Sequence, residues 1–373
     1  MNKLLLINQS TGYLTIDTAN AYASKYDEVV LLAGRVGDSE RKLDASIKVH
    51  PICAYNKSSA IKRMLTWGIA TIQIFFLLLF KYRKHEIVYV TNPPMSYLCS
   101  LVLKRTFSVI VYDTYPDALR NIGIKQGHWL YELWSRWNRK LFLQAKCVYT
   151  LSEGMAKQLT NYVDRSHIKV IPLWSGSEAF APIDKSQNPF AIKHCLQDKF
   201  VVMYSGNMGY THNVDVLIKV AELLKEHGNI HFLLVGEGKK KEQMLKDVER
   251  MQLPNCTFLG YQPFDLLPYS LAAADIGVVT LNDETALTIV PSKTFNLLAV
   301  GAPLLCIAPK ISEIATLIDM YNNGAVYDAH EVNEIVSFIL NLSQNSERTK
   351  IMSEQSLVAS KAYTKDNAMM YLS

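Results

Sequence analysis

The sequence predicts an α/β protein built from two Rossmann-like domains, each with a doubly wound parallel sheet. The chain has 373 residues, more than one hydrophobic core normally fills, because cores split into domains beyond about 250–300 residues. Short aliphatic runs alternate with amphipathic stretches, which is the pattern of repeated βαβ units. The alternation stops over residues 175–188 and then restarts. We therefore expect two similar halves, with ligands at the carboxyl ends of the strands in a cleft between them.

The expected strands are aliphatic runs of the length that suits a strand buried on both faces of a sheet. In the first half they are Leu4–Ile7, Glu28–Ala33, Glu86–Val90, Ser108–Tyr112, Lys146–Leu151 and Lys169–Leu173. In the second half they are Phe200–Tyr204, Ile230–Val235, Cys256–Leu259, Ile276–Thr280, Pro303–Ile307 and Ala325–Tyr327. The predicted domains cover residues 1–178 and 190–345, and the helical tail 346–373 is expected to pack back on the first domain.

Composition excludes several classes of partner. The net charge is only +5 and the basic residues form no long stripe, so we expect no nucleic-acid binding. The six cysteines and nine histidines show no metal-ligand spacing, so neither a metal site nor a disulfide framework is expected. A reducing cytoplasm is the compartment that fits this use of cysteine.

The most apolar part of the chain is Met64–Phe80. Basic residues flank it on both sides, at Lys62, Arg63, Lys81, Arg83 and Lys84. The run is shorter than the ~20 residues that cross a bilayer. Two interpretations stay open and are compatible: a helix in the core of the first domain, or a helix on an anionic membrane surface. The second would place the protein peripherally at the inner membrane.

Glycine turns follow two strands of the second half. Gly206 and Gly209 lie between a strand and a helix, where backbone N–H groups and a helix dipole could bind a diphosphate. Gly236 and Gly238 follow the next strand, where a ligand could approach the backbone closely. A plain tight turn would need the same glycines, so both interpretations remain.

Lys293 is the most informative candidate of the second half. Pro291 and Ser292 are good helix-start residues, and Lys293 comes in the first turn that they begin. A lysine there opposes the helix dipole unless an anion binds nearby. This position therefore predicts an anion-binding role.

In the first half, Asp113 and Asp117 follow a strand, where a carboxylate could bind acceptor hydroxyls or act as a base. Asp117 could equally be a turn former and helix cap. Gly12 and Tyr13 form another loop at a strand end and are expected to face the same acceptor. His212 is the one histidine expected beside these ligands, and no histidine has a partner for nucleophilic catalysis.

Six short motifs in this order resemble the retaining glycosyltransferases of family 4, which have the GT-B fold, and within them the lipopolysaccharide, colanic-acid and capsule transferases. The resemblance spans nearly the whole chain. It is specific because all six motifs occur in the family's order. The motifs are Tyr112-Asp113-Thr114-Tyr115-Pro116-Asp117, Leu151-Ser152-Glu153-Gly154-Met155, Val170-Ile171-Pro172-Leu173-Trp174, Tyr204-Ser205-Gly206-Asn207-Met208-Gly209, Leu234-Val235-Gly236-Glu237-Gly238 and Pro291-Ser292-Lys293.

The resemblance implies a transfer from a nucleotide-sugar, held by the second half, to a lipid-linked or growing glycan, held by the first. It implies no nicotinamide, and no metal or other cofactor is expected, because lysine and amides take the cation's role. Lys293 and Asp113 are the expected catalytic residues, and Gly12, Tyr13, Asp113 and Asp117 the acceptor residues. The expected donor residues are Gly206, Asn207, Gly209, Gly236, Gly238, Ser292, Lys293 and Asn296.

The sequence departs from the family pattern at three positions. Asn207 stands where the family has a phosphate-binding Arg, and Thr288 and Asn296 stand where it has paired glutamates. An amide at position 296 could still hydrogen-bond a ribose hydroxyl. Two alternatives to a transferase therefore stay open: a nucleotide-sugar-binding scaffold that has lost catalysis, and a sugar-nucleotide 2-epimerase.

Overall fold

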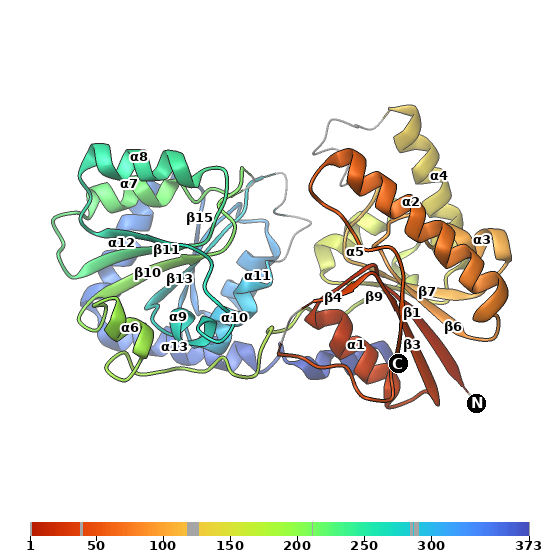
Figure 1. The fold of residues 1–373 in the computed structure, drawn as a ribbon. Helices are drawn as coiled ribbons and strands as arrows, with labels where there is room; N and C mark the ends of the chain where they lie inside the picture. Colours follow the sequence, from red (N-terminus) through yellow and green to blue (C-terminus); the bar gives the residue numbers. More distant parts are fainter. Residues whose placement is uncertain are drawn as a thin grey trace. The chain divides into compact units, whose positions relative to one another are not determined.

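The computed structural model describes residues 2–37, 40–117, 127–210, 212–283, 286 and 291–372. The chain forms two compact units, drawn in Figure 1. Unit 1 comprises Met1–Leu173 and Lys365–Ser373, and unit 2 comprises Trp174–Thr364. Each unit is an α/β domain with its own sheet, and each is described by itself below.

Unit 1 has a fully parallel sheet whose described strands run in the order β5-β3-β1-β6-β7-β8-β9. These strands are β1 (Lys3–Ile7), β3 (Glu28–Ala33), β5 (Lys48–Pro51), β6 (Glu86–Val90), β7 (Phe107–Val111), β8 (Val148–Thr150) and β9 (Ile168–Val170). A small separate sheet pairs β2 (Ser10–Thr11) with β4 (Arg35–Val36).

The helices of unit 1 cover this sheet (Figure 1). They are α1 (Tyr13–Ala23), α2 (Ala60–Phe76), a π-helix (Leu77–Lys81), α3 (Leu98–Leu103), α4 (Trp129–Gln144), α5 (Glu153–Leu159) and two 3-10 helices (Arg165–His167 and Lys365–Leu372).

Unit 2 has a second parallel sheet, in the order β12-β11-β10-β13-β14-β15. Its strands are β10 (Phe200–Ser205), β11 (Ile230–Val235), β12 (Cys256–Leu259), β13 (Ile276–Thr280), β14 (Leu304–Ile307) and β15 (Gly324–Tyr327). Its helices are α6 (Pro189–Lys193), α7 (Val216–Leu223), α8 (Lys241–Met251), α9 (Leu267–Leu271), α10 (Lys293–Ala299), α11 (Glu313–Tyr321), α12 (Val332–Gln344) and α13 (Ser346–Ser360).

All twelve expected strands are present within two or three residues of their predicted bounds. The structure adds β5, which the sequence did not predict. Its four residues include Lys48, His50 and Pro51, and it pairs only with β3 at the edge of the sheet. An edge strand needs no apolar run, because one side and much of both faces meet water.

The prediction for the tail 346–373 is wrong over α13. This helix belongs to unit 2, where it packs against α10, α11 and α12. Ser356 fixes it there, because its hydroxyl donates to the carbonyl oxygen of Ala302 at 2.8 Å and accepts from Asn323 at 3.1 Å. In the tail, the 3-10 helix Lys365–Leu372 returns to unit 1 and packs on α1, with Tyr371 buried.

Helix α2 and the π-helix form one helical stretch of 22 residues, Ala60–Lys81, and its most apolar 18 residues have a mean hydropathy of 1.7. By length and composition it could cross a membrane, which corrects the expectation that the run is too short. One face is part of the core of unit 1, through Ala70, Ile74 and Leu78. The core interpretation therefore holds for that face, and the opposite face is exposed.

Candidate functional site

The glycine turns of unit 2 lie side by side, because β10 and β11 are neighbouring parallel strands. Three backbone hydrogen bonds tie the two turns together. Gly206 donates to Val235 O at 2.9 Å, Met208 donates to Glu237 O at 2.8 Å, and Lys240 donates to Met208 O at 3.0 Å. The two loops thus form one interlocked edge at the carboxyl ends of the strands.

This interlocking explains why the second turn needs glycine. Gly236 has φ 137° and Gly238 has φ 155°, and both values lie in the range that favours glycine. A Cβ on Gly236 would lie 1.9 Å from the carbonyl oxygen of Gly206, and one on Gly238 would lie 2.4 Å from that of Met208. Close packing of the turns accounts for these two residues without a ligand.

Gly206 differs, because its open side faces Lys293. Its φ is 152°, and a Cβ there would lie 3.1 Å from Lys293 Nζ. Gly209 has no such backbone requirement, and the nearest atom to its missing Cβ is the amide nitrogen of Asn207. Asn207 itself is exposed at the tip of the turn.

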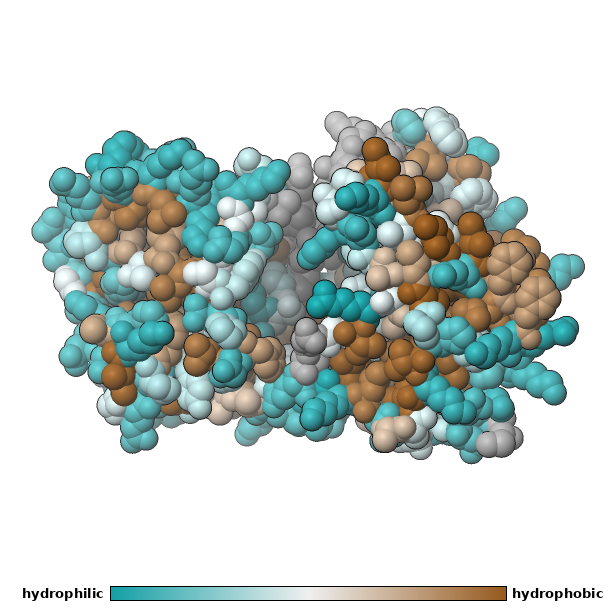
Figure 2. All heavy atoms as spheres, in the orientation of Figure 1, coloured by the Kyte–Doolittle hydropathy of each residue, from teal (hydrophilic) through white to brown (hydrophobic). Residues whose placement is uncertain are grey.

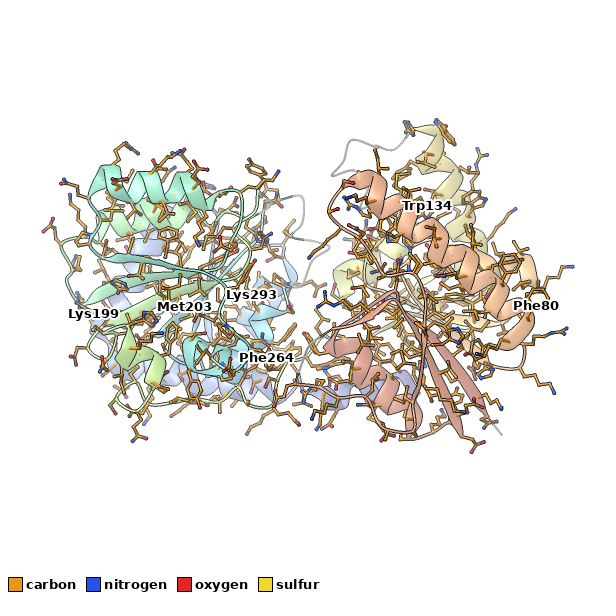
Figure 3. All side chains as sticks on the ribbon, viewed as in Figure 1. Phe80, Trp134, Lys199, Met203, Phe264 and Lys293 are labelled. Carbon is orange, nitrogen blue, oxygen red and sulfur yellow. The ribbon has the colours of Figure 1, made fainter. Side chains whose placement is uncertain are left out.

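The ammonium group of Lys293 is buried in this site (Figure 3). Its Nζ lies 3.7 Å from the centroid of the Tyr204 ring, a cation–π contact, and has no hydrogen-bond partner among the described residues. Burial lowers the pKa of Lys293 to about 7, because the charged form loses its hydration. A buried cation with free donors has the electrostatics to hold an anion.

The ring below Lys293 is the functional feature that the sequence analysis missed. Tyr204 lies on β10 and is buried, and its hydroxyl donates to the carbonyl oxygen of Asn207 at 2.6 Å. The ring therefore joins the strand, the glycine turn and the lysine. A tyrosine directly before a Ser-Gly turn was visible in the sequence, but nothing there indicated a lysine 89 positions away.

His212 lies close to the same group. Its Nδ1 is 3.1 Å from the carbonyl oxygen of Thr280. Burial lowers the pKa of His212, and the positive charges of Lys293 and Lys240 lower it further. His212 therefore feels the charge of Lys293, and its expected place in the ligand-binding cleft stays a prediction.

Two of the three lysines that follow Gly238 are engaged with neighbouring acids. Lys240 Nζ donates to Asp215 at 2.6 Å, and Lys241 Nζ donates to Glu237 at 2.7 Å. These two ion pairs order the loop. Among the described residues at this edge, Lys293 is therefore the lysine whose buried Nζ has no hydrogen-bond partner.

Two further donor candidates lie on α10. Ser292 precedes its first residue, is exposed and makes no side-chain cap bond. Asn296 does not present its oxygen to a ligand: Oδ1 accepts the backbone N–H of Gly176 at 2.9 Å. This corrects the expectation that its oxygen would accept a ribose hydroxyl. Thr288 lies outside the described residues.

In unit 1, the two aspartates after β7 have different surroundings. Asp117 is buried, and its two oxygens accept the hydroxyls of Tyr131 and Tyr162, each at 2.6 Å. It therefore ties helices together and does not offer a free carboxylate to an acceptor, which corrects its predicted role. Asp113 is exposed, and Thr91 Oγ1 accepts its backbone N–H at 3.2 Å.

Gly12 is the N-cap residue of α1 and is exposed, with no atom within 4 Å of where a Cβ would be. Tyr13 begins the helix and is half-buried. Gly12 directly follows β2, as predicted for a loop at a strand end, whereas Tyr13 already belongs to the helix.

A row of aromatic rings near Asp113 was not predicted. Tyr55 stacks on Trp67 with 5.9 Å between centroids, Trp67 meets Tyr115 edge-on at 5.9 Å, and Tyr115 stacks on Trp134 at 5.5 Å. The four rings come from four separate segments, before α2, within α2, after β7 and within α4, so local patterns could not group them. Aromatic faces of this kind can pack against the apolar face of a ligand.

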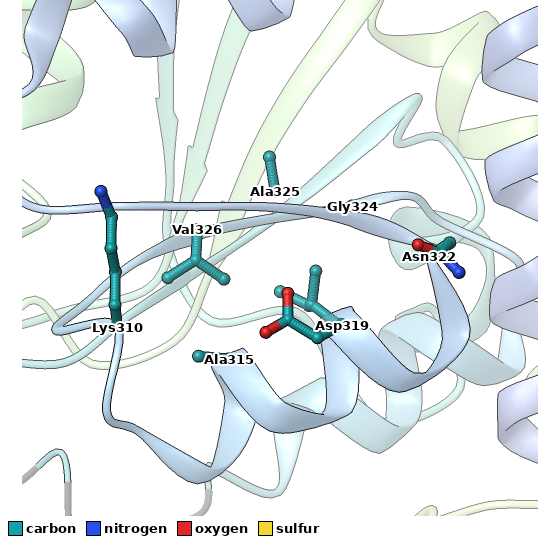
Figure 4. Close-up of a pocket in the computed structure, with 8 residues that line it drawn as sticks. Lys310, Ala315, Asp319, Asn322, Gly324, Ala325 and Val326 are labelled. Atoms are coloured by element: carbon teal, nitrogen blue, oxygen red, sulfur yellow. The ribbon is translucent and has the colours of Figure 1, made fainter.

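Over the described residues, no group of three or more His, Cys, Asp or Glu side chains could hold a metal ion. A hollow of about 300 Å³ lies between α11 and β15, lined by Lys310, Asp319, Asn322 and their neighbours (Figure 4). It contains none of the residues that the sequence singled out, so it does not define the site.

Residues 187–357 match the family model described as "Glycosyl transferases group 1". This segment holds both glycine turns, Lys293 and Asn296. Residues 187–357 are a glycosyl transferases group 1 domain. The group 1 domain therefore coincides with most of unit 2, and the resemblance seen in the sequence is confirmed for it.

Two curated relatives extend the likeness into unit 1. The chain is 26% identical over 292 residues to WcaI of Escherichia coli (strain K12), named as a candidate colanic acid biosynthesis glycosyl transferase, covering 74% of this chain and 70% of that protein. It is 24% identical over 270 residues to WbjE of Pseudomonas aeruginosa, named as a candidate glycosyltransferase, covering 69% and 67%.

Solved structures confirm the fold. HepE of Anabaena in complex with UDP-glucose matches with a TM-score of 0.73 at 16% identity, covering 100% of this chain and 98% of that one. Sucrose-phosphate synthase of Thermosynechococcus elongatus matches with a TM-score of 0.76 at 12% identity, covering 100% and 97%. The fold class is therefore the predicted one, with two parallel-sheet α/β domains as in GT-B glycosyltransferases.

Proposed function

We propose that this protein is a retaining glycosyltransferase that moves a hexose or N-acetylhexosamine from a nucleotide-sugar, in particular a UDP-sugar, to a lipid-linked or growing glycan. The product would be a cell-surface polysaccharide. The observation that carries the proposal is the buried, unpartnered ammonium of Lys293 beside the Gly206 turn of the group 1 domain. The names of the curated relatives support the pathway, and HepE in complex with UDP-glucose supports the donor.

Lys293 would act on the leaving group. When the bond between the sugar's anomeric carbon and the diphosphate oxygen breaks, negative charge builds on the diphosphate. A preorganised ammonium and backbone N–H groups stabilise that charge without reorganisation. The acceptor oxygen then bonds to the anomeric carbon on the same face, and its proton passes to the departing phosphate or to a base such as Asp113. The lysine supplies the charge that a metal would otherwise provide.

The test is calorimetric titration with UDP, GDP and their sugars, on the wild type and the Lys293→Met variant. We expect micromolar binding of one nucleotide, weakened about tenfold or more in Lys293→Met. Lys246→Met is the matched control, because Lys246 belongs to the same unit and is paired with Glu242 on the surface of α8. Absence of binding to every nucleotide would refute the proposal.

The scaffold alternative keeps one supporting observation. Asn296, at the family's glutamate position, has its oxygen occupied by Gly176. Turnover distinguishes the two functions: a transferase releases UDP from UDP-sugar in the presence of an acceptor and stops in Lys293→Met. A scaffold binds the donor and never turns it over.

A further inference from the structure

The exposed face of α2 carries a continuous apolar stripe. It consists of Ile61, Leu65, Ile69, Ile72, Phe76 and Phe80, whose exposed fractions lie between 49% and 72%. The first five recur at steps of four, four, three and four residues, so they share one side of an α-helix. Figure 2 shows this apolar surface along α2, and Figure 3 shows Phe80 projecting from the end of the helical stretch.

The stripe lies opposite the face that holds the helix on unit 1. Ala70, Ile74 and Leu78 belong to the core of unit 1 on that other face. Polar contacts add to the attachment: Gln9 Nε2 donates to Thr66 O at 3.0 Å, and Cys53 N donates to Gln73 Oε1 at 2.7 Å. A helix fixed in this way to a folded domain cannot leave it to cross a bilayer, so the stripe can only meet lipid from the side.

The formally charged residues in the segment that carries the stripe are all basic. Residues 45–85 contain seven Lys or Arg and no Asp or Glu, a formal charge of +7, whereas the whole chain has +5. The rest of the chain is therefore net −2. None of the basic residues belongs to the stripe. They are Lys48, Lys57, Lys62, Arg63, Lys81, Arg83 and Lys84.

We infer that this face of α2 is an interfacial anchor that rests on an anionic lipid bilayer. Apolar side chains would enter the acyl boundary, and the flanking lysines and arginines would meet the headgroups. A second copy of the chain fits less well, because a symmetric dimer through α2 would bring two +7 segments together. A convex helix face also offers no groove to a peptide.

The inference deepens the proposed function, on which it rests, by naming a membrane-facing surface for a transferase with a lipid-linked acceptor. The inner side of the same helix carries Trp67, whose Nε1 donates to Asn92 Oδ1 at 3.3 Å. Trp67 is also part of the aromatic row near Asp113. One helix thus connects the lipid surface to the predicted acceptor residues of unit 1, which suits an acceptor whose lipid stays in the membrane.

The experiment is co-sedimentation of the full chain with vesicles of phosphatidylcholine alone and with about 30% phosphatidylglycerol. We expect binding to the anionic vesicles that weakens with salt, and a loss of about tenfold or more in Leu65→Glu/Ile72→Glu. Ile351→Glu/Val358→Glu is the matched control, since these α13 residues are similarly exposed, at 51% and 50%. Lys81→Glu/Arg83→Glu/Lys84→Glu should lose only the preference for anionic vesicles.

Three results would overturn the inference. They are equal vesicle binding by Leu65→Glu/Ile72→Glu, no binding by the wild type, and a dimer in solution that this variant converts to a monomer. Circular dichroism establishes that each variant is folded. UDP titration of the same variants separates this inference from the proposed function, because the donor residues lie in unit 2 and should bind UDP unchanged.

Discussion

Lys293 Nζ sits 3.7 Å above the ring of Tyr204, and this buried nitrogen has no hydrogen-bond partner within the described residues. The ring cannot fully replace water, because a cation–π contact is worth about 0.5–2 kcal/mol while burying an unpaired charge costs several. The buried Lys293 ammonium therefore lowers the stability of the folded protein unless an anion binds.

Lys293→Met should make the protein more stable and impair donor binding at the same time. Methionine has a similar length and removes the unpaired amine, so we expect the free energy of unfolding to rise by about 1–3 kcal/mol. Urea denaturation without nucleotide measures this, with Lys246→Met as the control that should stay within about 0.5 kcal/mol. A less stable Lys293→Met would show that the amine is paired in solution.

The stability of the wild type should rise with pH between about 7 and 10.5. The folded-state pKa of Lys293 is lowered to about 7 from an ordinary value of 10.5. Between these values the unfolded chain binds the extra proton, so raising the pH favours the folded state, by a few kcal/mol over the window. Urea midpoints of wild type and Lys293→Met at pH 7 and pH 9.5 measure the difference. Equal slopes in the two proteins would contradict the lowered pKa.

UDP binding should take up a proton at pH 8. The free amine of Lys293 is mostly neutral there, given its pKa of about 7, and a bound diphosphate would restore the charged form. The expected uptake is close to one proton, ~0.9. Calorimetric titrations in two buffers with different ionisation enthalpies give the number directly. Binding with no proton exchange would place the diphosphate away from Lys293.

Gly236→Ala should be far more damaging than Gly12→Ala. A Cβ at position 236 would collide with Gly206 O at 1.9 Å and would need φ 137°, so we expect a loss of ~3 kcal/mol or more, or failure to fold. At Gly12, φ is −110° and no atom lies within 4 Å. The cost there should stay within about 1 kcal/mol. Thermal unfolding of both variants tests this contrast, which similar melting temperatures would refute.

Asp113→Asn and Asp117→Asn should separate activity from stability. Asp117 accepts two tyrosine hydroxyls, and an amide NH₂ cannot accept one of them, so we expect a loss of about 1–3 kcal/mol. Asp113 is exposed, and its amide variant should keep its stability within about 0.5 kcal/mol while transfer to the acceptor falls. Urea denaturation and sugar transfer, measured side by side, check both. An active Asp113→Asn would remove this residue from the mechanism.

The fold was predictable because buried parallel strands must be aliphatic on both faces. Strands such as β11 and β13 came out with their predicted bounds. The edge strand β5 was not predicted, because Lys48–Pro51 has no apolar run. The tail was misplaced for another reason: α13 has no apolar side in its sequence, and it is held by small buried residues, Ser356 and Ala359, which do not show which domain receives it.

The sequence predicted which residues lie at the carboxyl edge of each sheet, but not which other residues they contact. The position of a residue after a strand places it at the carboxyl edge of a sheet, which was enough for Gly206 and Asp113, and the helix start at Pro291 and Ser292 singled out Lys293. Neither observation reveals which polar atoms are already bonded inside the protein. The partner of Asn296 is 120 residues away and one partner of Asp117 is 45 residues away, and no local pattern connects such positions.

The return of Lys365–Leu372 to unit 1 has a consequence for biosynthesis. Tyr371 O accepts the hydroxyl of Tyr149 at 3.4 Å, and the Tyr371 ring packs on that of Tyr149 at 5.0 Å. Residues 1–173 are synthesised before unit 2, but these contacts form only after unit 2 has been synthesised. Unit 1 is therefore still incomplete while unit 2 is being made, and the stripe of α2 is already present in the nascent chain.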